Sequence, residues 1–305
     1  MRIGLGLELS GTVEEIVARA RVLASTGVVS LWSSQLFGWD TLTVLAVVGR
    51  EVPGIDLGTA VIPVQPRHPM MLAEQALTVQ NASGARLTLG IGLSHQVVVE
   101  GAWGYSFDRP ARYMREYLSV LVPLLRGEQV SFNGEVIQTN TFGPLDVAPT
   151  PPPPVLVAAL GPTMLRMAAT LADGTVTWMA GPATIADHIV PTITAAALDA
   201  GRPLPQVVVT LPVCVSDDPD AARARADRIF ALYGQLPSYR AMLDREGVSG
   251  PADVAVVGSE DEVAAQIRRL ADAGATEFSG AVYGTPDEVE RSRALLGALA
   301  KTASS

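Results

Sequence analysis

Apolar residues fall into short continuous runs that alternate with stretches where they recur every three or four positions. A continuous run bounded by turn residues is typical of a buried strand, and the longer period is typical of an amphipathic helix. The chain contains eight strand-like runs, at residues 3–7, 28–32, 57–62, 87–93, 155–159, 175–179, 207–215 and 278–283.

Helical stretches separate these runs, and two of them begin with a recognisable cap. Thr12 followed by Glu15 forms a capping box, as does Ser259 followed by Glu262. Gly27 is expected to end the first helix. The other predicted helices lie at 41–50, 69–82, 110–126, from 161 and from 181 onward, at 220–233, at 239–246 and from 285 to the C-terminus.

Eight strands that alternate with helices predict a parallel sheet, because parallel neighbours need crossover connections. An open doubly wound sheet is the alternative, but eight units in 305 residues favour a closed (β/α)8, or TIM, barrel. We expect one α/β domain over residues 1–305, with insertions after strands four and seven. We predict that residues 127–150 form a loop with a short hairpin. The proline run that follows is predicted to be a rigid segment that leads into strand five.

Charge and composition narrow the function classes. The formal net charge is -9 and no basic run is present, so we expect no nucleic-acid partner. Histidine, cysteine and acidic residues show no metal-ligand spacing, so no metal site is predicted. The single cysteine, Cys214, lies in an apolar run and is expected to be buried. With no signal-peptide core and no apolar run of about 20 residues, a cytoplasmic protein without a membrane span is expected.

The active site of such a barrel lies where strands end and βα loops begin. His95 comes directly after the fourth strand, whose small residues leave room for a flat ligand. The alternative is a histidine that only satisfies a neighbouring carbonyl group. His68, before Pro69 at a helix start, is expected to be structural, and His188 a surface residue of the sixth helix.

The turn Gly161-Pro162-Thr163 opens a helix and offers free backbone N–H groups, which suit a phosphate. Gly-Pro also begins many helices that bind nothing, so both interpretations stay open. Neither a Rossmann nor a P-loop signature nor a serine-hydrolase elbow is present. Five aromatic residues near the expected mouth belong either to an apolar pocket or to the core: Trp32, Trp39, Trp103, Tyr105 and Trp178.

Residues 57–104, LGTAVIPVQPRHPMMLAEQALTVQNASGARLTLGIGLSHQVVVEGAWG, are similar to the segment from strand three to strand four of the luciferase-like monooxygenase superfamily. Within it they resemble the branch that uses coenzyme F420. The stretches FDRPARYMREYL, VAALGPTMLRMAATLADGTVTW and VVGSEDEVAAQIRRLADAGATEF agree with this, in the same order. The resemblance spans nearly the whole chain.

The resemblance implies a set of site residues. A non-prolyl cis peptide in strand three, here Ala60–Val61, would support the cofactor ring from behind. The ring would contact Ser94 and His95, and the cofactor tail and phosphate would lie along small residues after strand five. Where relatives often carry Asp or His after strand two, this chain has Ser34 and Gln35, which moves proton transfer to His95. The remaining expected cofactor contacts are Ala158, Ala159, Gly161, Pro162, Thr163 and Trp178.

The implied activity is hydride transfer between a deazaflavin, coenzyme F420, and a small organic substrate, with His95 as the proton donor. One alternative keeps the barrel and uses FMN and dioxygen, as a monooxygenase does. Another is a flavin-binding barrel without catalysis. The resemblance also implies a homodimer packed through helices near strands two and three.

Overall fold

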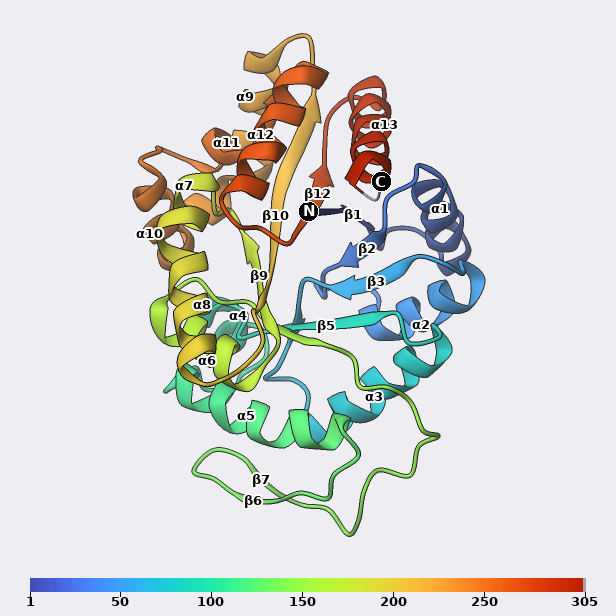
Figure 1. Ribbon diagram of the computed structural model, residues 1–305, viewed down its shortest axis with the longest axis vertical. Helices are drawn as coiled ribbons and strands as arrows, with labels where there is room; N and C mark the ends of the chain where they lie inside the picture. Colours follow the sequence, from blue (N-terminus) through green and yellow to red (C-terminus); the bar gives the residue numbers. More distant parts are fainter. Residues whose placement is uncertain (304–305) are drawn as a thin grey trace.

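The computed structural model describes residues 1–303 and contains a closed barrel of parallel strands (Figure 1). Each strand pairs with the next around the ring, β10 pairs with both β9 and β12, and β12 pairs with β1. This pairing confirms the predicted TIM barrel. Its strands are β1 (Arg2–Gly6), β2 (Ser30–Ser33), β3 (Asp56–Thr59), β5 (Leu87–Gly92), β8 (Val155–Val157), β9 (Gly174–Trp178), β10 (Gln206–Val215) and β12 (Glu277–Val282).

Helices surround the barrel, and their starts follow the capping chemistry of the sequence. The capping box of Thr12 and Glu15 is present at the first helix, and Glu262 bonds back to Ser259 at α12. The helices that cover the barrel are α1 (Val13–Ser25), α2 (Thr41–Glu51), α3 (Pro69–Ala82), α5 (Pro110–Leu125), α6 (Pro162–Leu171), α8 (Val190–Asp199), α12 (Glu260–Asp272) and α13 (Pro286–Ala303).

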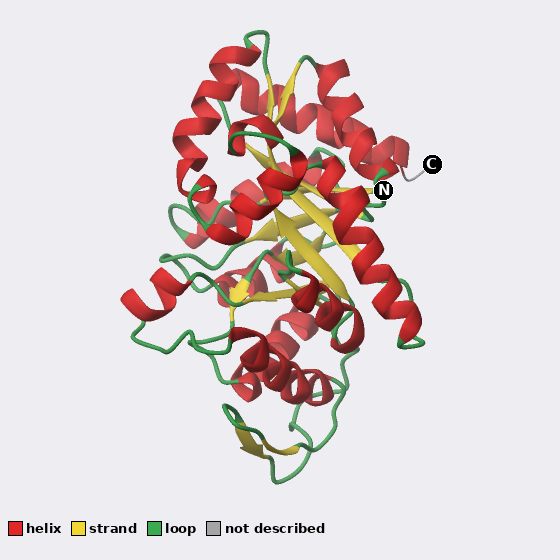
Figure 2. Cartoon of the chain, turned by 90° about the vertical axis from the view of Figure 1, so that its left-hand side faces the viewer, coloured by secondary structure: helices red, strands yellow, loops and turns green. Residues whose placement is uncertain are grey.

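Both predicted insertions are present. The first contains α4 (Gln96–Gly101) and the hairpin of β6 (Ser131–Asn133) and β7 (Gln138–Asn140), which projects away from the barrel (Figure 2). The second contains α9 (Pro219–Phe230), η2 (Ala231–Gly234), α10 (Pro237–Glu246), α11 (Pro251–Val254) and β11 (Val256–Gly258). The sequence did not predict α4, α11 or β11, because three to six residues are too few to show a period.

Two predicted elements are interrupted. The third strand breaks at residues 60–61 and resumes as β4 (Ile62–Pro63), which pairs with β5. The sixth helix divides into α7 (Pro182–Thr184), a π-helical turn η1 (Ile185–Ile189) and α8, where a proline at position 191 lacks the N–H of a regular helix. The expectation that His188 is a surface residue was wrong. It is buried on η1, with Nε2 2.8 Å from the carbonyl oxygen of Leu160.

The barrel interior has a packed floor. Trp32 fills its centre together with Leu156, Val176 and Val208. The indole N–H of Trp32 donates to Glu277 Oε1 at 2.6 Å, and Arg2 pairs with the other oxygen of the same carboxylate. Because this buried carboxylate has its partners, the floor is a structural plug rather than a reactive site.

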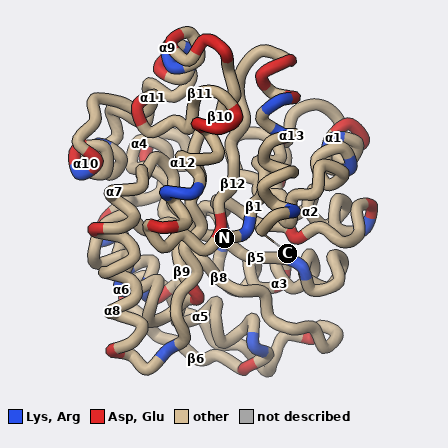
Figure 3. The backbone as a smooth tube through the Cα atoms, turned by 45° about the horizontal axis from the view of Figure 1, so that its top comes forward, with Lys and Arg blue, Asp and Glu red and all other residues tan. Residues whose placement is uncertain are grey.

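Charged residues are spread over the outer helices (Figure 3). Several form ion pairs between neighbouring elements, for example Arg21 with Glu51 and Arg291 with Glu260. Within residues 1–303, no helix has the length and apolar character needed to cross a membrane.

Candidate active site at the C-terminal mouth of the barrel

One half of the mouth, formed by β3, β5 and β8, presents small side chains and backbone. The predicted cis peptide between Ala60 and Val61 is present, and Ser34 Oγ donates to the Ala60 carbonyl at 2.6 Å. A Cβ atom added to Gly92 would lie 2.6 Å from Val61 Cγ2 and 3.2 Å from Ala158 Cβ. The close approach of these strand ends therefore depends on glycine, and it leaves a low wall on this side.

His95 lies at the same edge, between β5 and α4. Its imidazole makes no side-chain hydrogen bond within residues 1–303, and its ring contacts Tyr239 edge-on at 5.7 Å between centroids. Partial burial lowers the pKa of His95 below its usual value of about 6.5. The structure therefore leaves both ring nitrogens free, and the free protein holds the ring uncharged at neutral pH.

Two non-glycine residues at strand ends adopt left-handed backbone conformations. Ser94, after β5, has φ 57°, and Met179, after β9, has φ 56°. Such conformations are uncommon for these residue types and gather at functional sites, where the surrounding structure enforces them. They turn the chain sharply at the two places where His95 and Trp178 reach the mouth.

The other half of the mouth is lined by an aromatic cluster that also contacts His95. Trp178 lies edge-on to Phe230 and Tyr233, and Tyr239 links Tyr233 to His95, with ring centroids 5.3–5.7 Å apart. Burial raises the pKa of Tyr239, so its phenol stays neutral across the physiological range. Trp178 was predicted from the sequence. Phe230, Tyr233 and Tyr239 were not, because their helices lie over 130 residues beyond His95 and share no motif with it.

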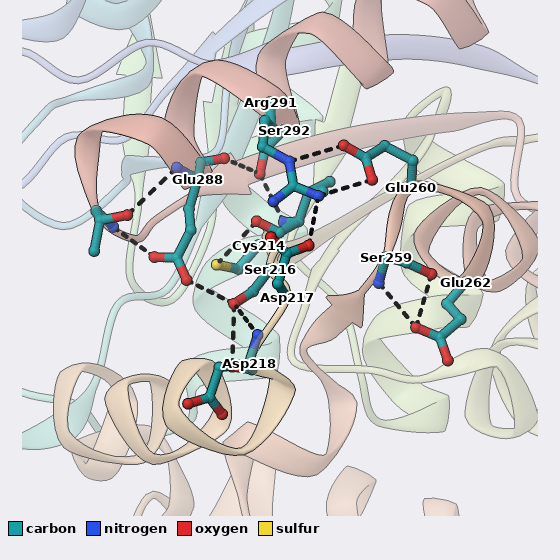
Figure 4. Close-up of polar contacts among 12 residues, drawn as sticks. Cys214, Ser216, Asp217, Asp218, Ser259, Glu260, Glu262, Glu288, Arg291 and Ser292 are labelled. Carbon is teal, nitrogen blue, oxygen red and sulfur yellow. Dashed lines mark hydrogen bonds and ion pairs between the residues drawn. The ribbon is translucent and has the colours of Figure 1, made fainter.

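Several helix starts at the mouth already hold a carboxylate. Figure 4 shows Glu288, which accepts from the Thr285 N–H before α13, and Glu262, which accepts from the Ser259 N–H before α12. Glu246 accepts from two backbone N–H groups at α7, at 3.1 and 2.7 Å. Barrels commonly bind phosphate after strands seven and eight, but these carboxylates would repel an anion there.

The start of α6 differs from these helices. Gly161, its N-cap, makes no side-chain cap, and the first turn of the helix contains no acidic residue. Gly161, Pro162 and Thr163 are all exposed, and nothing lies within 4 Å of a Cβ built on Gly161. The N-terminus of α6 therefore remains accessible to an anion.

The remaining predicted residues divide between the mouth and the framework. Gln35 is held in the framework: its Oε1 accepts from the Thr41 N–H at 2.8 Å, and its amide donates to loop carbonyls. Ala159 is buried in the hydrophobic core, on the face away from the barrel interior. His68 caps α3 through Nδ1, as expected for a structural histidine. Of the other aromatic candidates, Trp32 is part of the floor, whereas Trp39, Trp103 and Tyr105 lie in loops.

Comparison with known proteins agrees with this architecture. The chain is 27% identical over 328 residues to 5,10-methylenetetrahydromethanopterin reductase of Methanolobus tindarius, with 97% of each chain covered. It is 30% identical over 222 residues to the F420-dependent glucose-6-phosphate dehydrogenase of Nakamurella multipartita, over 71% of this chain and 63% of the relative. The solved F420-dependent tetrahydromethanopterin reductase of Methanopyrus kandleri superposes with a TM-score of 0.80 at 22% identity, over 97% of this chain and 98% of the other.

The family model described as luciferase-like monooxygenase matches residues 1–277. This range includes the first seven of the eight predicted strands. The curated relatives named above are a reductase and a dehydrogenase, and their sequences align with 97% and 71% of this chain. The chain is therefore an oxidoreductase, and it belongs to the luciferase-like monooxygenase family.

Proposed function

We propose that this protein is an F420-dependent oxidoreductase that transfers hydride between the deazaflavin and a small organic substrate. The observation that carries this proposal is the pairing of a low wall of small residues, around Gly92 and Ala158, with an unbonded His95 at its edge. The names of the two curated relatives, one of them explicitly F420-dependent, support the choice of cofactor.

The residues present fit a flat ring with an anionic tail. Val61, Gly92 and Ala158 would lie against the ring, because larger side chains there would occupy its place. The free N–H groups at the start of α6, around Thr163, would receive the phosphate. The carboxylates at the starts of α7, α12 and α13 would repel the phosphate of the cofactor. The cofactor tail should therefore run toward the start of α6.

When bound, the reduced deazaflavin supplies a hydride, and the protein must supply a proton to the substrate. His95 is the titratable side chain best placed to do so, since both its ring nitrogens are free. Because burial lowers the pKa of His95, its acid form is populated only below about pH 6.5 in the free protein. Substrate reduction should therefore be favoured by mildly acidic conditions, and proton acceptance during substrate oxidation by neutral ones.

A side-by-side titration tests the choice of cofactor. Purified protein is titrated with oxidised F420 and with FMN, and binding is followed by quenching of cofactor fluorescence. We expect saturable binding of F420 at least tenfold tighter than that of FMN. Thr163→Asp, which places a carboxylate at the start of α6, should weaken F420 binding about tenfold, because the helix dipole then has its own anion. Tight binding of FMN alone would contradict the proposal.

An FMN-dependent monooxygenase is the second candidate, since the matching family model is described as luciferase-like monooxygenase. The two reactions differ in their use of dioxygen. An F420-dependent oxidoreductase turns over anaerobically with its organic substrate, whereas the monooxygenase consumes dioxygen and needs reduced FMN. A barrel that binds a flavin without catalysis would show neither activity.

A further inference from the structure

Two hydroxyl groups face the inside of the barrel on neighbouring strands. Thr210 of β10 and Ser279 of β12 are partners in the parallel register. Their neighbours on each strand point outward: Leu211 packs in the core between barrel and helices, and a Cβ on Gly280 would meet Leu296 of α13. Strand alternation therefore directs Thr210 and Ser279 inward.

Neither hydroxyl has a hydrogen-bond partner. In the described part of the chain, four buried side-chain polar atoms lack one, and three of them are Thr210 Oγ1, Ser279 Oγ and Trp178 Nε1. The Trp178 indole lies near the Tyr233 hydroxyl, but without the geometry of a regular hydrogen bond. Trp178 of β9 is the register partner of Thr210, so the three residues occupy consecutive strands at one level. An unpaired buried polar group costs about 1–3 kcal/mol, so three together at one level indicate a place where a ligand completes their bonding.

The residues beside these groups are small or already bonded. Gly4 of β1, the register partner of Ser279, is covered by Ser30 and Trp32 of the floor, whereas a Cβ on Gly6, further along β1, would make only ordinary contacts with Gly280 and Ala281. The buried carboxylate one step below, on Glu277, is already bonded by Arg2, Ser30 and Trp32. Arg2 is already paired with Glu277 and Asp56 and so would not balance an anionic ligand, and a charge held there would lose its hydration without compensation.

The polar groups of Thr210, Ser279 and Trp178 favour a ligand atom that accepts hydrogen bonds. An indole N–H can only donate, and both hydroxyl groups can donate to the same oxygen. A carbonyl oxygen has two lone pairs and no proton, so it suits this set. Beyond Trp178, the aromatic cluster of Phe230, Tyr233 and Tyr239 offers an apolar surface for the rest of such a molecule.

We propose that Thr210, Ser279 and Trp178 form the substrate subsite, and that they bind the carbonyl oxygen of a neutral ketone or enone. This inference rests on the proposed function, which places the cofactor ring against the opposite half of the mouth. It names the class of substrate that the sequence left open.

Binding of cyclohex-2-enone to protein loaded with oxidised F420 tests the subsite, with isothermal titration calorimetry as the readout. Thr210→Val and Ser279→Ala should each weaken enone binding about tenfold, which corresponds to about 1.4 kcal/mol, and leave F420 affinity unchanged. Glucose 6-phosphate should not compete, because the subsite contains no cation.

Thermal denaturation without ligand provides a second readout and a matched control. Thr175 of β9 is also a buried strand threonine, but its hydroxyl donates to the Val157 carbonyl at 2.8 Å. Thr175→Val should therefore lower the melting temperature and leave enone binding unchanged. Thr210→Val and Ser279→Ala should leave the melting temperature unchanged or raise it, because they remove unpaired groups.

Three outcomes would overturn the subsite. One is equal enone affinity in the wild type and in the Thr210→Val, Ser279→Ala double variant, which would mean that the hydroxyls bind only ordered water. The others are loss of stability equal to that of Thr175→Val, and effective competition by glucose 6-phosphate. If F420 itself does not bind, the proposed function fails, and the same enone titration on cofactor-free protein decides the subsite separately.

Discussion

The two halves of the barrel mouth are built from different materials. The β3, β5 and β8 half consists of backbone and small side chains, with Gly92 in contact range of Val61 and Ala158. The β9, β10 and β12 half carries Trp178, the unpaired hydroxyls and the aromatic residues of the second insertion. The β3, β5 and β8 half is suited to a flat ring that lies close against the backbone. The β9, β10 and β12 half is suited to a molecule that side chains recognise.

We infer from this difference that one half of the mouth binds the cofactor and that the other half selects the substrate. On the small-residue half, most substitutions add bulk, so the ring proposed to bind there is positioned mainly by the course of the backbone. On the aromatic half, the residues proposed to select the substrate come partly from an insertion, a kind of segment that can vary without disturbing the barrel. Damage to the first half should therefore abolish cofactor binding, and changes to the second should alter turnover and substrate choice.

The largest effect is expected from Gly92→Leu. A side chain there overlaps Val61 and Ala158 and fills the space proposed for the ring. F420 binding should fall at least 100-fold, measured by fluorescence titration, while circular dichroism shows that the fold persists. Gly143→Leu is the matched control, because nothing lies within 4 Å of a Cβ at that position. Equal F420 affinity in the two variants would refute the division of the mouth into two halves.

His95→Gln should have the next largest effect, on turnover. The amide keeps a polar side chain but cannot give up a proton, so kcat should drop about 100-fold while F420 affinity changes little. In the wild type, kcat/KM for substrate reduction should decrease as pH rises through a value below 6.5, because burial lowers the pKa of His95. This limb should disappear from the pH profile of the variant. A persistent limb would assign the proton to another group.

Glu246→Gln should have the smallest effect. Glu246, at the end of α10, accepts from the N–H groups of Ala183 and Thr184 and so joins the second insertion to α7. Loss of the charged acceptor should cost about 1 kcal/mol of unfolding free energy, seen as a melting temperature lower by a few degrees. KM for the substrate should rise and F420 affinity should not, since only the aromatic half is loosened. A change in F420 affinity alone would argue against this assignment.

The sequence predicted the regular part of the molecule well. All eight barrel strands, the capping box at Thr12 and the hairpin inside residues 127–150 follow from local patterns that the structure repeats. The cis peptide at Ala60–Val61 came from family resemblance rather than from any local pattern.

The aromatic half of the mouth could not be predicted in the same way. Tyr239 meets His95 across 144 residues of chain, and the hydroxyls of Thr210 and Ser279 are notable only because nothing bonds to them in three dimensions. His188 was misplaced for a related reason. Its helix widens into a π-helical turn that directs the ring inward, to the carbonyl of Leu160, and a regular helical period does not foresee this.

A crystal structure of the protein soaked with oxidised F420 tests the central claim most directly. We expect density for the deazaflavin ring against Val61, Gly92 and Ala158, with its phosphate at the start of α6 and the level of Thr210 and Ser279 left free for substrate. A ring that lies instead among Trp178, Tyr233 and Tyr239, or outside the barrel mouth, would contradict the account.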